Sequence, residues 1–81
     1  MAQIRECKHS AAVVTMVIAR NIRRLREARG ETQLRFAKRT GLDRSRLSGW
    51  EQGTHPPTVV SLQRIAEGLD VEVWELLRDP R

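Results

Sequence analysis

The stretch TQLRFAKRTGLDRSRLSGWEQG, residues 32–53, decides the fold of this 81-residue chain. It holds two short helical patterns on either side of Gly41. Thr32 and Asp43 stand directly before these patterns and carry side-chain oxygens of the kind that cap helix N-termini. Glycine tolerates the positive φ of a tight turn. The stretch therefore predicts two short, side-chain-capped helices joined by a tight turn.

Apolar spacing along the rest of the chain predicts three more helices and no strand, so the expected fold class is all-α. Pro56 and Pro57 must lie in a loop, because proline interrupts a helix. The run AVVTMVI, residues 12–18, is rich in β-branched residues, so an extended conformation is the alternative there. The five expected helices run from Ser10 to Gly30, over 33–40, over 44–52, from the cap Thr58 to Asp70, and from about Glu72 to Asp79.

One side of each expected helix is apolar or small and should face a common core. Trp50 belongs to this side, whereas helical periodicity turns Trp74 partly away from it. Trp74 then either covers the edge of the core or lies in a dimer interface. The remaining expected core residues are Ala11, Val14, Ile18, Ile22, Leu25, Phe36, Ala37, Thr40, Leu47, Val59, Leu62, Ile65, Ala66, Leu69, Val73, Leu76 and Leu77.

Length and composition indicate one small domain in a soluble, intracellular protein. The single cysteine, Cys7, excludes an internal disulfide. The longest apolar run is far shorter than the ~20 residues of a membrane span and does not look like a signal peptide. Cys7 and His9 supply only two potential ligands, so no metal site is expected. No nucleophile–base arrangement or phosphate-binding glycine loop is visible, so we expect neither an enzyme nor a cofactor.

The net charge of +5 conceals an uneven distribution. Residues 1–50 carry +8, whereas residues 51–81 carry −3. Arginine dominates the basic residues and suits paired hydrogen bonds to phosphate or guanine, although a GC-rich genome also favours arginine. Genome composition does not sort charge by position, so the asymmetry is the better indication of an anionic partner. Arg20, Arg23 and Arg24 form either a solvated face or a secondary phosphate contact.

The expected helix 44–52 has an exposed arc of short or hydrogen-bonding residues. At about 100° per residue, Leu47 and Trp50 lie together toward the core. The opposite arc lacks the Glu/Lys pairs at i,i+4 spacing that are typical of a solvated face. Its small residues let the backbone approach another surface closely, as in a helix lying in the DNA major groove. The arc consists of Arg44, Ser45, Ser48, Gly49 and Gln52.

Residues 32–53 resemble the helix-turn-helix of the lambda-repressor-like family, the Cro and phage-repressor type also called the XRE family. The likeness needs no gaps and extends over roughly residues 17–77. It implies a compact five-helix DNA-binding domain over residues 16–78. It also implies a cytoplasmic, nucleoid-associated protein of a prokaryote or phage. Residues 1–15 would form an N-terminal extension that is partly disordered or extends the first helix. The motif residues in register are Gln33, Ala37, Gly41, Leu42, Leu47, Trp50, Glu51, Gln52 and Gly53.

The resemblance implies DNA contacts position by position. Arg44 and Ser45 would read base edges, with Ser48 in support. Gln33, at a helix N-terminus, would hydrogen-bond a phosphate together with backbone N–H groups. Arg46 points away from the exposed arc, so a phosphate contact or plain solvation suits it better than base reading. The further candidates for phosphate contacts are Thr32, Arg35, Thr54 and His55.

The resemblance also pairs Arg26 with Glu51 in a buried ion pair that joins the first helix to the end of the third. Arg26 lies on the flank of the first apolar stripe, and Glu51 flanks Leu47. We expect this pair to be structural, because breaking it would leave a poorly solvated charge.

Four residues depart from the family pattern. Gly49 stands where a base-contacting side chain is common, so the reading surface is expected to be narrower. Thr40 replaces an aliphatic residue and is expected to hydrogen-bond within its own helix. Arg35 replaces an acidic residue, which removes a capping box and adds attraction for phosphate. Asp70 stands where glycine is common.

These observations favour a transcriptional regulator that binds double-stranded DNA and acts as a repressor. Because one small domain reads few base pairs, we expect a homodimer on a palindrome. A second apolar strip on the first helix, Val13, Met16 and Val17, or the surface of the fifth helix would mediate dimerisation.

Two alternatives remain at this level. One is the antitoxin of a toxin–antitoxin pair, which binds its own promoter and has a toxin as protein partner. The other is a helical protein-interaction adaptor that keeps the fold without binding DNA. A membrane or small-molecule partner is not expected.

Overall fold

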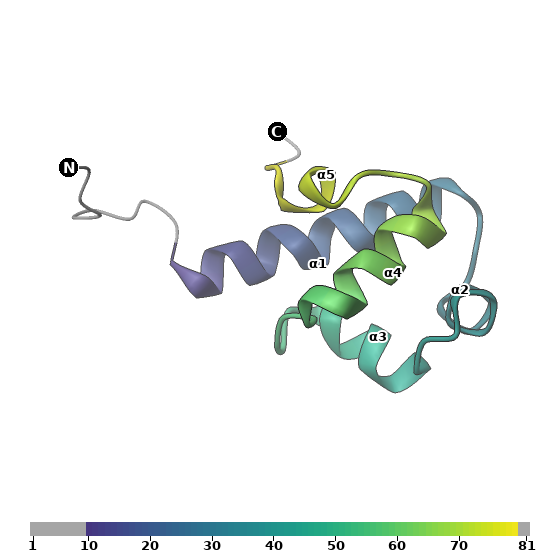
Figure 1. Ribbon diagram of the computed structural model, residues 1–81. Coiled ribbons are helices and arrows are strands. Elements are labelled where there is room, and N and C mark those ends of the chain that lie inside the picture. The colour runs from purple at the N-terminus through teal and green to yellow at the C-terminus, as the bar shows by residue number, and fades with distance from the viewer. Residues whose placement is uncertain (1–9, 80–81) are drawn as a thin grey trace.

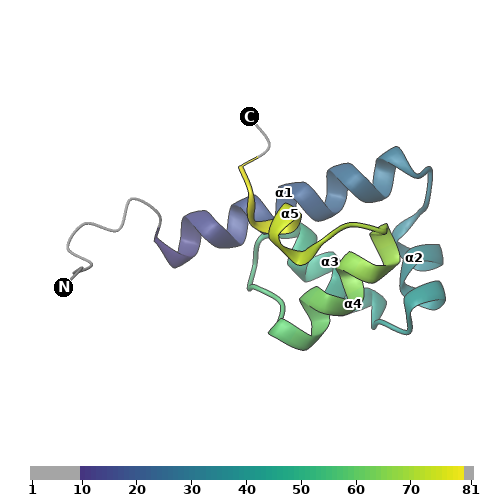
Figure 2. The same cartoon turned by 45° about the horizontal axis from the view of Figure 1, so that its top comes forward.

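The computed structural model describes residues 10–79, and within them every regular element is an α-helix. This confirms the expected fold class. The chain order is α1 (Ala11–Ala28), α2 (Gln33–Thr40), α3 (Arg44–Gln52), α4 (Val59–Leu69) and α5 (Val73–Leu77). Figures 1 and 2 show α1 as the longest helix, which packs against α3, α4 and α5 and whose first turns extend beyond them.

The helix boundaries follow from side-chain caps. Thr32 Oγ1 accepts a hydrogen bond from the Arg35 N–H, and Asp43 Oδ1 accepts one from the Arg46 N–H, both at 3.1 Å. Ser10 and Thr58 cap α1 and α4 in the same way. Each cap satisfies one of the N–H groups that the first turn of a helix leaves unpaired.

The turn between α2 and α3 depends on Gly41, which adopts φ +74°. Its conformation lets the Leu42 N–H return to the Ala37 carbonyl at 2.9 Å. This ends α2 and redirects the chain into α3 within three residues. Asp70 ends α4 with φ +59°, although it carries a side chain where glycine would be unstrained.

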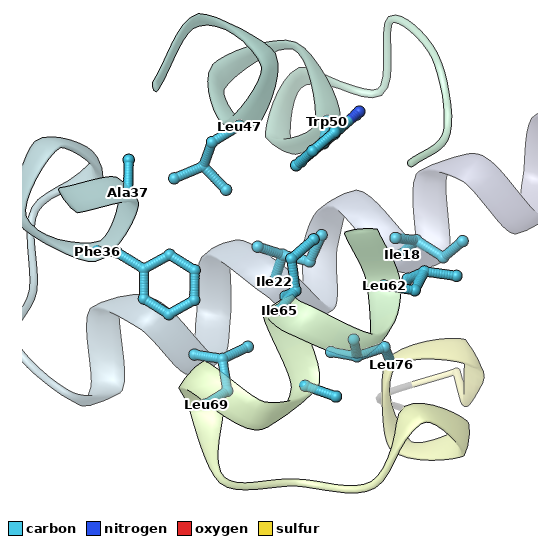
Figure 3. Packing of buried hydrophobic residues seen from close by; sticks show 11 residues of the cluster. Ile18, Ile22, Phe36, Ala37, Leu47, Trp50, Leu62, Ile65, Leu69 and Leu76 are labelled. Atoms are coloured by element: carbon cyan, nitrogen blue, oxygen red, sulfur yellow. The ribbon is translucent and has the colours of Figure 1, made fainter. Parts of the chain in front are cut away.

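The core lies where α1, α3 and α4 meet, and α2 and α5 close it at the sides. Figure 3 shows Ile22 and Ile65 at its centre, with Leu47 and Trp50 pointing into it from α3. Ile22, Ile65 and Leu47 are fully buried. The core cluster consists of Ile18, Ile22, Phe36, Ala37, Leu47, Trp50, Leu62, Ile65, Ala66, Leu69 and Leu76.

Three expected core residues are exposed instead. Ala11 precedes the part of α1 that other helices cover, and Val59 lies in the first turn of α4, where its side chain is 79% exposed. Leu77 is 46% exposed, because the short α5 directs Leu76 into the core and leaves its neighbour outside. Apolar periodicity identified the correct face of each helix, but it did not show which residues on that face are left uncovered by other helices.

The β-branched run over residues 12–18 is helical, so the extended alternative is wrong. Thr15 stabilises this conformation locally by donating its hydroxyl to the Ala11 carbonyl at 2.7 Å. Thr40 makes the expected bond of the same kind to the Phe36 carbonyl at 2.7 Å. Its methyl carbon also lies close to Gly68, where α2 and α4 approach each other.

A buried asparagine attaches α5 to α1. The Asn21 side-chain amide is fully buried and donates to the Leu76 carbonyl at 2.9 Å and to the Arg78 carbonyl at 2.7 Å. These carbonyls end a helix of five residues, which cannot satisfy them itself. Asn21 was not among the expected core residues, although its place between Ile18 and Leu25 on the apolar stripe is a signal of burial.

None of the described helices combines the length and the hydropathy needed to cross a bilayer.

Candidate nucleic-acid interface

Helix α3 has two chemically distinct sides. Leu47, Trp50 and Glu51 are buried on one side, as Figure 3 shows for the first two. On the other side Arg44 and Ser45 are exposed. The remaining residues of this exposed face are the half-buried Ser48 and Gly49, and the exposed Gln52.

Arg44 and Arg46, at the start of α3, are exposed cations without an internal counter-ion. Within residues 10–79 neither guanidinium forms a hydrogen bond or an ion pair. Arg44 projects from the first turn on the exposed face. Arg46 lies on the side nearer α4, beside Trp50 and Ser61. Both guanidinium groups are therefore available to an anionic or hydrogen-bond-accepting ligand.

A buried ion pair joins α1 to the end of α3. Arg26 Nε lies 2.7 Å from Glu51 Oε2, and a second guanidinium nitrogen lies 2.9 Å from Glu51 Oε1. The two side chains are only 9% and 3% exposed. This paired geometry is the strong form of the arginine–carboxylate interaction. The hydrogen bonds to Glu51 hold the pKa of Arg26 above its usual value.

The same network reaches the N-terminus of α2. Gln33 donates its side-chain amide to Glu51 Oε1 at 3.0 Å, and Arg26 donates to the Glu31 carbonyl at 2.6 Å. The beginning of α2 is thus fixed relative to the end of α3. The amide nitrogen of Gln33, expected at a phosphate, is engaged inside the protein, while its side-chain oxygen makes no hydrogen bond within residues 10–79.

The other residues expected at phosphates lie at two places beside α3. Thr32 and Arg35 are exposed at the start of α2, where Thr32 serves as the helix cap. Thr54 and His55 are exposed in the loop that follows α3. The exposed face of α3 is therefore accompanied by candidate residues from α2 and from the loop after α3, and Figure 1 shows α2 and α3 as neighbours.

The loop after α3 folds back over the helix. Gly53 adopts φ +77°, and the Thr54 N–H donates to the Gly49 carbonyl at 3.0 Å. The His55 ring then lies directly against Gly49. Pro57 is buried, which fixes the far end of this short loop on the protein.

Arg39 takes no part in this surface. Its guanidinium forms two 2.7 Å hydrogen bonds to the Glu31 carboxylate and a third, at 2.8 Å, to the Gly68 carbonyl. The Arg39 guanidinium holds the pKa of the Glu31 carboxyl below its usual range. Sequence reasoning missed this connection between α2 and α4, because local periodicity cannot reveal partners separated by 29 residues.

Among residues 10–79 there is no group of three potential metal-ligating side chains. Cys7 and His9 lie outside the described residues.

Comparisons with known proteins agree with this geometry. The model of the Helix-turn-helix family matches residues 22–76. An uncharacterised HTH-type transcriptional regulator of Sinorhizobium fredii is 36% identical over 61 residues, which are 75% of this chain and 79% of that protein.

Two solved structures have a similar fold. A hypothetical transcription factor from Neisseria superposes with a TM-score of 0.78 at 30% identity, over 83% of this chain and 77% of that one. The restriction-modification controller protein C.AhdI of Aeromonas hydrophila superposes with a TM-score of 0.72 at 35% identity, over 76% and 94% of the two chains. The chain therefore belongs to the lambda-repressor-like (XRE-type) helix-turn-helix family of DNA-binding transcriptional regulators.

Proposed function

We propose that this protein is a non-enzymatic repressor that binds a palindromic site in double-stranded DNA as a homodimer and inserts α3 into the major groove. The observation that carries the proposal is the contrast on α3 itself. Glu51 is neutralised by Arg26 inside the protein, whereas Arg44 on the exposed face has no partner within residues 10–79. The small residues beside Arg44 let the helix backbone lie close to base edges, and the exposed arginine can then contact a base.

Arg44 is the principal base-reading residue of this proposal. Its planar guanidinium matches the O6 and N7 acceptors of guanine, a pair worth about 1–3 kcal/mol of discrimination. Ser45 and Ser48 extend the same face and offer shorter hydrogen-bonding groups. Gln52 donates to Ser48 Oγ at 3.1 Å, which orients that hydroxyl in the absence of DNA.

Backbone contacts would fix the protein on the duplex. Thr32, Gln33 and Arg35 surround the N-terminus of α2, whose free N–H groups suit a phosphate. Arg46 lies on the side of α3 nearer α4, and Thr54 and His55 lie in the loop that follows α3. All three would contact the sugar-phosphate backbone. Such contacts set orientation and affinity without reading sequence.

For dimerisation we propose the apolar strip at the start of α1. Val13 and Met16 are 42% and 48% exposed, and Val17 lies beside them. The helix that carries them begins at Ala11, within the proposed N-terminal extension, residues 1–15, that precedes the domain 16–78. Replacing Val13 and Val17 by glutamate should halve the mass measured by light scattering. An unchanged mass would move the interface to α5, where Trp74 and Leu77 are exposed.

Selection of bound sequences from random duplexes tests the main proposal. The wild-type protein should select a palindrome containing guanine, and Arg44→Ala should relax the preference at that guanine alone. Arg23→Ala is the matched control, because Arg23 is exposed but paired with Glu27 on α1. An equal loss of affinity for all sequences in Arg44→Ala would show that Arg44 contacts a phosphate and not a base. No binding to any duplex at low salt would instead favour an adaptor function.

The similarity to a restriction-modification controller favours a second, more specific function. The chain covers 94% of that controller, so the likeness includes the whole fold and not the motif alone. Control of a neighbouring modification system is therefore the second candidate, and an antitoxin that regulates its own promoter is the third. Mobility-shift assays with the DNA upstream of the protein's own gene and of the adjoining genes show which promoters it binds. The coding sequences of the adjoining genes then distinguish a modification system from a toxin.

A further inference from the structure

Gly49 lies on the exposed face of α3, yet the space beside its Cα is filled. A Cβ atom at this position would lie 2.8 Å from Cε1 of His55 and 3.6 Å from each ring nitrogen. The first distance is shorter than van der Waals contact between carbon atoms. The His55 ring therefore occupies the place that a side chain of residue 49 would take.

The backbone holds the ring at this position. Gly53 ends α3 in the left-handed conformation, and the Thr54 N–H returns to the Gly49 carbonyl. His55 follows at once and precedes Pro56, whose ring restricts the backbone of both residues. The buried Pro57 then anchors the loop. The position of the imidazole is thus set by the local fold and not by a hydrogen bond of its own.

The polar atoms of the ring are free for a ligand. His55 is exposed, and within residues 10–79 neither ring nitrogen has a hydrogen-bond partner. Histidine always presents at least one N–H donor, and in its neutral form an acceptor as well. A group of this kind on the exposed face of α3 can pair with base edges in the major groove.

We infer that His55 is a specificity-determining residue that takes over the base-reading position left vacant by Gly49. This inference rests on the proposed binding of α3 in the major groove. The ring N–H would donate to a major-groove acceptor, either O6 or N7 of guanine or O4 of thymine. Under this inference His55 contacts a base and not a phosphate.

The position of Gly49 along α3 separates this contact from that of Arg44. Gly49 follows Arg44 by five positions, which is about 7.5 Å of helix. Base pairs follow one another every ~3.4 Å. His55 and Arg44 should therefore determine different base pairs of the same half-site.

Selection from random duplexes with four proteins tests this inference: the wild type, His55→Ala, Gly49→Ala and the double variant. His55→Ala should relax one base-pair position, different from the one that Arg44→Ala relaxes, by about 5- to 150-fold in relative affinity. Gly49→Ala should relax the same position although His55 is intact, because the new methyl group displaces the ring. At that base-pair position the double variant should lose no more sequence preference than His55→Ala alone.

Thermal unfolding of each variant shows that the fold is kept. Alanine favours helix over glycine at position 49, so Gly49→Ala should not unfold α3. Equal weakening on all sequences by His55→Ala would make His55 a phosphate contact and overturn the inference. An unchanged selected motif would overturn it as well. Absence of any motif with the wild-type protein would overturn the proposed function itself.

Discussion

Arg26 and Arg44 lie on helices of one small domain but in opposite surroundings. Arg26 is buried, and its guanidinium meets the Glu51 carboxylate and the Glu31 carbonyl. Arg44 is exposed, and no group within residues 10–79 pairs with it. The α1–α2–α3 junction therefore uses its charges to fix helices, while the exposed face of α3 keeps its charge available. Because the buried junction fixes α3, a ligand that binds its exposed face meets side chains that are already in position.

The largest effect should come from breaking the buried junction. Glu51→Ala leaves the Arg26 charge buried with only a carbonyl partner and should lower the free energy of unfolding by about 3–5 kcal/mol. Urea denaturation measures this loss. Glu27→Ala is the control, because it removes the exposed Arg23–Glu27 pair, which is worth less than about 1 kcal/mol. Equal losses from the two variants would show that burial of the Arg26–Glu51 pair has no special weight.

A second buried polar group supports the fold away from the exposed face of α3. Asn21→Ala leaves the Leu76 and Arg78 carbonyls without their donor and should cost about 1–3 kcal/mol of stability. Urea denaturation gives this cost, and hydrogen exchange should show faster opening of α5 than of α3. Uniform loss of protection across the domain would contradict a local role in attaching α5.

A change on the exposed face of α3 should affect DNA binding and leave stability nearly unchanged. Arg44→Ala should leave the free energy of unfolding within about 0.5 kcal/mol of wild type, because its side chain has no internal contact to lose. The same change should weaken binding to the selected sequence by about 1–3 kcal/mol. Fluorescence anisotropy with labelled duplexes measures the binding. A large loss of stability would show that Arg44 belongs to the supporting network.

The smallest effect should come from the partly exposed ion pair between Arg39 and Glu31. Arg39 lowers the pKa of Glu31, so this carboxylate stabilises the folded state above the ordinary pKa of glutamate, about 4.3. The contribution disappears as the pH falls through the lowered folded-state value. Wild type should therefore exceed Glu31→Gln in stability at neutral pH and lose that advantage in strong acid. Thermal unfolding across this range checks the sign, and a difference independent of pH would contradict it.

Much of the fold was predictable from local sequence. The capping residues Thr32, Asp43 and Thr58 and the turn glycine Gly41 act within three or four positions of themselves. Their effects are visible in the sequence because the atoms they bind are sequence neighbours. Apolar periodicity also placed Leu47 and Trp50 in the core, and it failed at Val59 and Leu77, where a helix face has no neighbour to cover it.

The exposed face of α3 was predictable in part. Residues 44–52 present the expected arc, because a helix has a fixed period. The expectation that Gly49 narrows this surface was incomplete, since the ring of His55 fills the space beside it. The return of the loop over the helix depends on Gly53, a carbonyl bond and buried Pro57 acting together. Single-residue preferences do not reveal such a combination.

The sequence by itself determined the helix boundaries that caps and turn residues fix, and which side of α3 faces away from the core. These properties depend on bonds between near neighbours in the chain. Only the tertiary structure decided which charges are used internally and which remain free. Arg26, Arg39 and Arg44 are the same residue type on exposed or flanking helix positions, and they differ because only two of them meet a carboxylate contributed by another part of the chain. Long-range packing places those carboxylates, and packing is a property of the whole domain.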